Sequence, residues 1–219
     1  MPISKSRAWL TVAAASALLI YGCGGGSSGS STSSATPTTL SANLVDGPVK
    51  GVCYLASPSG TKGTTSATGT YNFVAGDAVS FWIDTSGTGC GATAATNIST
   101  TGISLGAVTP ATTATGTTQQ TFILSLSTGA QAAETLHALN HGTTANMDVS
   151  GVALPAANVS NINSYIATSG GSTGTAPDVV SLFTAAQSAA TVAAAAPFNL
   201  PVNSTFQSAV VNNLSATAN

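Results

Sequence analysis

The chain has 219 residues, enough for one domain with a tail, and only 5% of them are charged, against roughly 25% in an average soluble domain. Lys plus Arg total 4 and the formal net charge is −2. A nucleic-acid-binding surface needs basic side chains to neutralise phosphates, so this composition excludes nucleic acid as a partner. Disorder driven by high charge is also excluded. Hydrophobic residues make up 43%, but 38 residues are alanine, so bulky core side chains are scarce.

The first 22 residues have the features of an export signal. Lys5 and Arg7 provide a positive start, and an apolar run follows from Ala8 to Ile20. That run is shorter than the ~20 residues that a membrane-spanning helix needs. We therefore expect residues 1–22 to be a signal peptide that is removed after export.

The end of this segment contains Ile20, Gly22 and Cys23. An aliphatic residue and a small residue ahead of a cysteine resemble the signal of bacterial lipoproteins. The resemblance implies that Cys23 is the lipid-attachment residue and the mature N-terminus, modified with diacylglycerol and a fatty acid such as palmitate. The alternative is an ordinary secretory signal that is cut elsewhere, with Cys23 incidental.

Residues 23–42 are expected to form a flexible tether, because they consist mostly of Gly, Ser and Thr. Such a tether holds a folded domain away from a lipid anchor. Gly24 stands where, in the lipoprotein resemblance, an acidic residue is associated with retention at the inner membrane. We therefore predict a Gram-negative outer-membrane lipoprotein that contacts the membrane through its N-terminal lipid. Whether it faces the periplasm or the cell surface stays open.

Once Cys23 is assigned to the lipid, Cys53 and Cys90 remain. An even pair in an exported chain predicts a disulfide. Closing a loop of this length is worth about 3–4 kcal/mol in chain entropy, a large share of the stability of a domain with a thin core. The alternative is two independent buried thiols.

Residues 43–110 show the alternation and the turns of a β domain. Val79, Phe81 and Ile83 alternate along one expected strand, so they share a face. Strands are expected within four segments, separated by Gly-containing turns: 49–55, 70–74, 78–83 and 98–108. Short strands at this spacing predict a small antiparallel β-sandwich.

Three pieces of this region form a recognisable series. The run 46–52 contains a G-x-V strand, the segment 63–73 contains T-x-A-x-G followed by an aromatic strand, and 76–81 opens with a G-D turn. Together they resemble the carboxypeptidase-regulatory-like, transthyretin-like β-sandwich of bacterial surface lipoproteins and adhesins. Leu105 and Gly106 fit the usual exit of that module. The resemblance implies a fold and says little about function.

The segment 111–219 is expected to be a helical, Ala-rich portion packed on the sandwich. Apolar stripes predict helices over 131–140 and 158–168, and Asp178 is placed to cap a third that runs to Ala190. Phe206, Val210 and Leu214 predict a last short helix. The chain as a whole is therefore predicted to be α+β, with a disordered N-terminal tether.

Glu134, His137 and His141 form the strongest constellation for metal binding. Offsets of three and seven residues place them on one face of a helix, opposite Leu136 and Leu139. Two imidazoles and a carboxylate are suitable ligands for zinc or nickel. The simpler interpretation, which we favour, is an exposed polar face of that helix.

Other motifs give weaker evidence for a functional site. Residues 102–106 match G-x-S-x-G, but a nucleophile elbow requires a following helix, and Pro110 with a Thr-rich stretch follows instead. Asp46 and Asp77 adjoin glycine and are interpreted as turn residues rather than calcium ligands or an acid–base pair. Trp82 and Tyr71 are expected in the core rather than on a carbohydrate platform.

These observations predict a lipid-anchored surface or periplasmic interaction protein, adhesin-like, with a protein or a glycan as its surface partner. We expect no enzymatic activity and no cofactor. The alternative is a periplasmic metal-binding protein that uses Glu134, His137 and His141.

Overall fold

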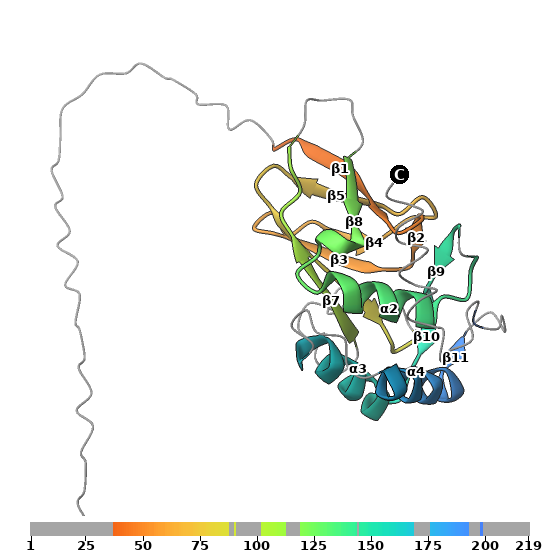
Figure 1. The fold of residues 1–219 in the computed structure, drawn as a ribbon. Helices are drawn as coiled ribbons and strands as arrows, with labels where there is room; N and C mark the ends of the chain where they lie inside the picture. Colours follow the sequence, from red (N-terminus) through yellow and green to blue (C-terminus); the bar gives the residue numbers. More distant parts are fainter. Residues whose placement is uncertain are drawn as a thin grey trace, which may run out of the picture. The chain divides into compact units, whose positions relative to one another are not determined.

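A three-stranded sheet, a four-stranded sheet and three α-helices make up most of the described fold (Figure 1). The computed structural model describes residues 37–87, 90, 102–112, 119–143, 145–168, 176–192 and 198. They lie within one compact unit that spans residues 36–219. The predicted α+β class is confirmed. The signal segment 1–22, Cys23, most of the tether and the helix predicted around 206–214 lie outside the described residues.

The three-stranded sheet has the order β5-β1-β8, with bounds Thr70–Val74, Thr39–Val45 and Gln119–Phe122. β1 pairs antiparallel with β5 and parallel with β8. Strand β1 starts at Thr39, so the last four residues of the predicted tether are folded, and the boundary at 42 is wrong. The alternation of Leu40, Ala42 and Leu44 explains this strand, because those side chains face inward while the Ser and Asn residues between them face out.

The four-stranded sheet has the order β4-β3-β6-β7 and is antiparallel throughout. Its strands span Lys62–Thr64, Cys53–Ser57, Ala78–Asp84 and Gly102–Val108. The single strand predicted over 49–55 is broken into β2 (Val49–Lys50) and β3. Gly51 causes the break, because its φ is +90° and a Cβ there would collide with the backbone of Ser150.

Two short strand pairs complete the β structure. β2 pairs in parallel with β9 (Met147–Asp148), and β10 (Val152–Ala153) pairs antiparallel with β11 (Thr191–Val192). The parallel pairs β1–β8 and β2–β9 depart from the wholly antiparallel arrangement that the sequence predicts. Both bring a strand from beyond residue 110 onto the N-terminal half of the fold, so residue 110 is not a structural boundary.

Tyr71 joins the two larger sheets. Its ring lies 5.8 Å from that of Tyr54 and 5.0 Å, edge to face, from that of Phe81. The Tyr71 hydroxyl shares a 2.6 Å hydrogen bond with Thr121 of β8. Burial raises the pKa of Tyr71, and the Thr121 hydrogen bond offsets part of that rise. Trp82 is buried too, so the expected core placement of Tyr71 and Trp82 is confirmed.

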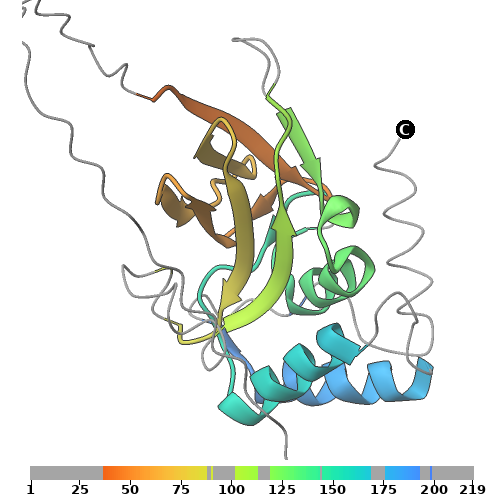
Figure 2. The same ribbon diagram turned by 90° about the vertical axis from the view of Figure 1, so that its left-hand side faces the viewer.

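The helices α2 (Gly129–Leu139), α3 (Ala156–Thr168) and α4 (Ala176–Ala189) match the three predicted before residue 190. A 3₁₀ turn, η1 (Ile123–Ser125), connects β8 to α2. Helix α4 begins at Ala176, so Asp178 lies in its first turn rather than at the predicted cap. Figures 1 and 2 show α2 between the β5-β1-β8 sheet and the α3–α4 pair.

The predicted disulfide between Cys53 and Cys90 is confirmed, with the two Cα atoms 5.4 Å apart. Cys53 opens β3 and Cys90 belongs to the connection between β6 and β7. The bond therefore fastens that long connection to the four-stranded sheet. It closes a loop of 37 residues, the length on which the stability estimate above depends.

Candidate functional site

Helix α2 carries Glu134 and His137, two of the predicted metal-ligand candidates. The expectation that they occupy an exposed face is wrong, because Glu134 is 5% exposed and His137 is 1% exposed. Helix α2 contacts β7, α3 and α4, so its polar side is covered as well as its apolar side. Every residue of α2 from Gln131 to Leu139 is buried. Apolar periodicity locates the inward stripe of a helix but does not show that the opposite side faces water.

His137 pairs with Asp46 inside the protein. Its Nε2 lies 3.1 Å from Oδ2 of Asp46, and each side chain is 1% exposed. The turn between β1 and β2 supplies Asp46, so the predicted turn role is correct for its backbone but misses this contact. Within the described residues, Asp46 Oδ1 and His137 Nδ1 have no hydrogen-bond partner. A carboxylate oxygen accepts hydrogen bonds, so the tautomer that carries hydrogen on Nε2 makes this contact a hydrogen bond.

Glu134 takes a different partner, one that α3 contributes. The hydroxyl of Tyr165 donates a hydrogen bond to Oε2 of Glu134. Burial raises the pKa of Tyr165, and the hydrogen bond and negative charge of Glu134 raise it further. Tyr165 thus stays a neutral donor to Glu134 across the physiological pH range. Together with the Asp46 contact, this bond ties α2 to two different parts of the chain.

His141 lies beyond the end of α2, and its Nε2 is 2.9 Å from the carbonyl oxygen of Ser150. Asp148 is nearby, 3.8 Å from that nitrogen, and it accepts a 2.8 Å hydrogen bond from Lys50 Nζ. Burial acts to raise the pKa of Asp148. The hydrogen bonds from Lys50 and Ser150 and the nearby His141 outweigh it, so this pKa lies below its ordinary value.

The three predicted ligands therefore turn to three separate partners: Asp46, Tyr165 and the 148–150 segment. Among the residues that the structure describes, no group of three or more His, Cys, Asp or Glu side chains is placed to hold a metal ion. The contacts of Glu134, His137 and His141 position α2 and the residues that follow it.

The G-x-S-x-G match lies wholly within strand β7, where the backbone N–H of Ser104 donates to Asn163 Oδ1 at 3.0 Å. Asp77 serves its turn, as predicted, by accepting hydrogen bonds from Ser59 and from the backbone of Val74. Burial acts to raise the pKa of Asp77, but these hydrogen bonds hold it below its ordinary value. Both motifs are parts of the sheet framework.

The exposed side of the β5-β1-β8 sheet is a different kind of feature. We call it the outer face; on it, side chains from the three strands lie in register, and none of the three strands contains a charged residue. Its members are uncharged and either exposed or half-buried: Thr39, Ser41, Asn43, Val45, Thr70, Asn72, Gln120 and Phe122. The opposite side of the same sheet carries core residues such as Leu44 and Phe73.

Hydrogen bonds fix the polar side chains of the outer face. The Ser41 hydroxyl donates to Asn72 Oδ1 at 2.8 Å, and the Thr70 hydroxyl donates to Asn43 Oδ1 at 2.9 Å. Each amide is therefore held through its oxygen, which leaves its NH₂ group to donate elsewhere. Asn43 also stands in register with Gln120 of β8, so a hydroxyl and two amides form one row across the sheet.

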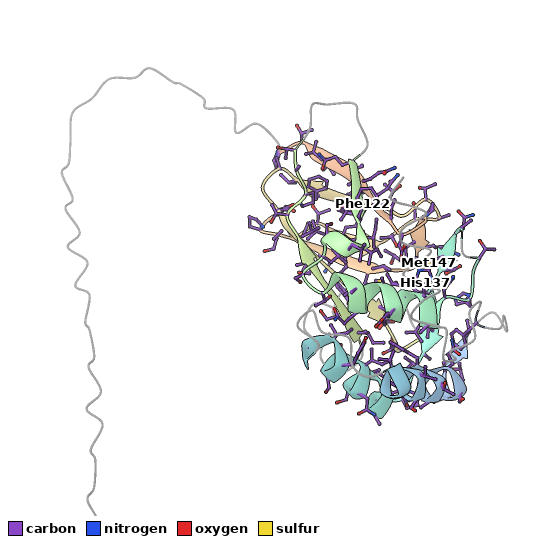
Figure 3. The ribbon with its side chains drawn as sticks, in the orientation of Figure 1. Phe122, His137 and Met147 are labelled. Carbon is purple, nitrogen blue, oxygen red and sulfur yellow. A yellow bond between two sulfur atoms is a disulfide. The ribbon has the colours of Figure 1, made fainter. Side chains whose placement is uncertain are left out.

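One end of the outer face is apolar and slightly hollow. Val45 and Phe122 are cross-strand neighbours, and with Gly47 and Gln120 they line an open pocket of about 170 Å³. Phe122 is 43% exposed; Leu124 of η1, at 51%, is the other exposed large hydrophobic side chain in the described part of the chain. Figure 3 shows Phe122 on β8 and His137 on α2. The outer face thus offers fixed amides beside an accessible aromatic ring.

Sequence reasoning missed this surface. The signal was present in the alternation of Ser41, Asn43 and Val45, but these residues adjoin a Ser/Thr-rich tether of similar composition. The place of β8 beside β1 depends on a parallel pairing between segments more than 70 residues apart. Periodicity along one strand carries no information about such a pairing.

Comparison of the chain with protein-family models, with curated proteins and with solved structures finds no match. No helix within the described residues is both long enough and apolar enough to cross a membrane.

The Asp46–His137 pair yields a test of how the β1–β2 turn is fixed to α2. We expect Asp46→Ala or His137→Ala to cost about 3–5 kcal/mol of unfolding free energy, because each leaves the other group buried alone. The double variant should cost less than the sum of the two by more than about 1 kcal/mol. Urea denaturation of the four proteins measures this, and additive single costs would contradict the pairing.

Asp148 yields a test in pH. Its pKa is lower in the folded state than the ~3.9 of an unfolded chain, so its stabilising effect is complete above about pH 4 and is lost as the pH falls through the folded value. Asp148→Asn should lower stability by about 1 kcal/mol at pH 7. Thermal denaturation should show the difference from wild type shrinking as the pH falls below about 4. A difference that stays constant with pH would exclude this role.

Proposed function

We propose that this chain is a lipid-anchored interaction protein of the Gram-negative cell envelope, adhesin-like and without catalytic activity, that binds its partner through the outer face. The observation that carries the proposal is the outer face itself: an exposed sheet surface with no charged residue, fixed amides and an accessible Phe122. Exposed aromatic and amide groups on a rigid framework are suited to binding.

The order of segments along the chain supports an anchor at the N-terminus and a binding surface on the sheet that follows it. Residues 37 and 38 lead directly into β1, the middle strand of the sheet that carries the outer face. A lipid on Cys23, followed by the uncharged Gly/Ser/Thr tether, would hold this sheet at a distance from the membrane. In the proposed fold the two larger sheets are the halves of a transthyretin-like sandwich, a proposal that the ring contacts of Tyr71 across them support.

The titratable side chains that catalysis would require make structural contacts within the fold. Asp46, Glu134, His137 and Asp148 each have a partner within the fold. A general acid or base needs a titratable group that can reach a substrate, and His137 is 1% exposed. Binding through shape, hydrogen bonds and one aromatic ring is the function that the accessible residues favour.

A charge placed on the outer face tests the proposed function. Vesicles carrying the full mature chain should adhere to surfaces coated with desialylated mucin. We expect Asn72→Asp, on β5, to reduce adhesion at least roughly tenfold, because a carboxylate at the interface must lose its hydration. Asn161→Asp, at an exposed position of α3, is the matched control and should adhere like wild type. Equal adhesion of the two variants, or none above protein-free vesicles, contradicts the proposal.

The anchor has its own test. Intact-mass measurement of the chain from the membrane fraction should show a mature N-terminus at Cys23 with an added diacylglycerol and a fatty acyl chain. Cys23→Ser should abolish both the lipid mass and the membrane association. An unmodified Cys23, or a mature chain that begins at another residue, would show that the export signal is an ordinary one.

A further inference from the structure

We infer that the ligand of the outer face is a neutral saccharide, with one sugar ring seated in the pocket formed by Val45, Gly47, Gln120 and Phe122. This inference rests on the proposed function and specifies the chemical class of its partner. Its basis is the combination, on one rigid surface, of an exposed aromatic ring, three side-chain amides and no charge.

Charge decides between classes of ligand. β1, β5 and β8 contain no Lys, Arg, Asp or Glu, so nothing in these strands would compensate the desolvation of a carboxylate, sulfate or ammonium group. Asp46, which follows Val45 directly in the chain, is buried and pairs with His137. A ligand without charge is therefore the electrostatic match.

The side chains present what a sugar ring requires. A pyranose has hydroxyl groups around its edge and a face of C–H bonds. The Phe122 ring, 43% exposed at the pocket, can cover such a face, while the Gln120 amide beside it can donate to one hydroxyl and accept from another. Because Asn43 and Asn72 are held through their oxygens, their NH₂ groups are oriented before a ligand arrives.

Size and spacing extend the match beyond one ring. The pocket, at about 170 Å³, is smaller than the ~300–1,000 Å³ of sites that enclose a whole drug-sized molecule, and it suits a single ring. The row Gln120, Asn43, Thr70 runs from the pocket across three strands, which lie about 4.8 Å apart. Further rings of an oligosaccharide can therefore follow this row of hydrogen-bonding groups. A shallow open site of this kind binds along a chain rather than around one end.

The test uses the full mature chain in detergent and isothermal titration with defined probes: neutral tetrasaccharides of glucose, galactose, mannose and N-acetylglucosamine, and tetragalacturonic acid. We expect at least one neutral probe to bind and the acidic one to bind at least roughly tenfold more weakly. Phe122→Ala should raise the Kd for the neutral probe roughly tenfold or more, and Gln120→Ala should raise it several-fold. Phe122→Trp should keep binding. Leu124→Ala removes the other exposed hydrophobic side chain and should leave the Kd unchanged.

The outcomes separate this inference from the proposed function. If no neutral tetrasaccharide binds, if the acidic probe binds as well, or if Phe122→Ala binds normally, the saccharide inference is overturned. A parallel adhesion assay compares desialylated mucin with its chemically deglycosylated protein core. Equal adhesion to the bare core, lost in Asn72→Asp, would keep the interaction function and assign it to a protein partner. Adhesion to neither coating would overturn both.

Discussion

The described fold depends on the burial of α2 from Gln131 to Leu139, a stretch that carries Gln131, Glu134 and His137 into the interior. Burying such groups costs free energy unless each finds a partner. The partners come from elements distant in sequence: Asp46 from the β1–β2 turn and Tyr165 from α3, while Gln187 of α4 donates to the backbone of α2. These polar contacts favour one arrangement of the β1–β2 turn and the helices around α2, because any other arrangement would leave the buried groups without partners.

The sequence could predict features that local patterns determine, but it could not predict contacts between segments that are far apart in the chain. Helices α2, α3 and α4 were predictable because their apolar stripes recur at helical spacing. The Cys53–Cys90 bond was predictable because these two cysteines remain once Cys23 is assigned to the expected lipid anchor. The environment of His137 was not predictable, since it depends on Asp46, 91 residues away. The start of β1 was obscured because its outward residues resemble those of the tether. The outer face depends on the β1–β8 pairing, a tertiary choice that local patterns do not encode.

The few charged groups of this chain are distributed unevenly. Asp46 and Glu134 are buried and partnered, Asp148 pairs with Lys50 near β2, and the strands of the outer face have none. A surface without charge usually risks self-association, particularly along the edge of a sheet. Here the hydroxyl and amide side chains are linked to one another across β1 and β5, which fixes their positions. Neutrality is thus compatible with a well-defined surface.

The central position of β1 has a mechanical consequence. The strand is the first element of the described fold, and it lies between an antiparallel neighbour, β5, and a parallel one, β8. A pulling force that enters through the N-terminal side acts along β1, so it loads the hydrogen bonds to both neighbours in shear, and these must break together rather than one after another. In the proposed lipid-anchored protein, a load on the tether would therefore reach this sheet first. Several of the residues that we propose to face a partner lie on this same strand.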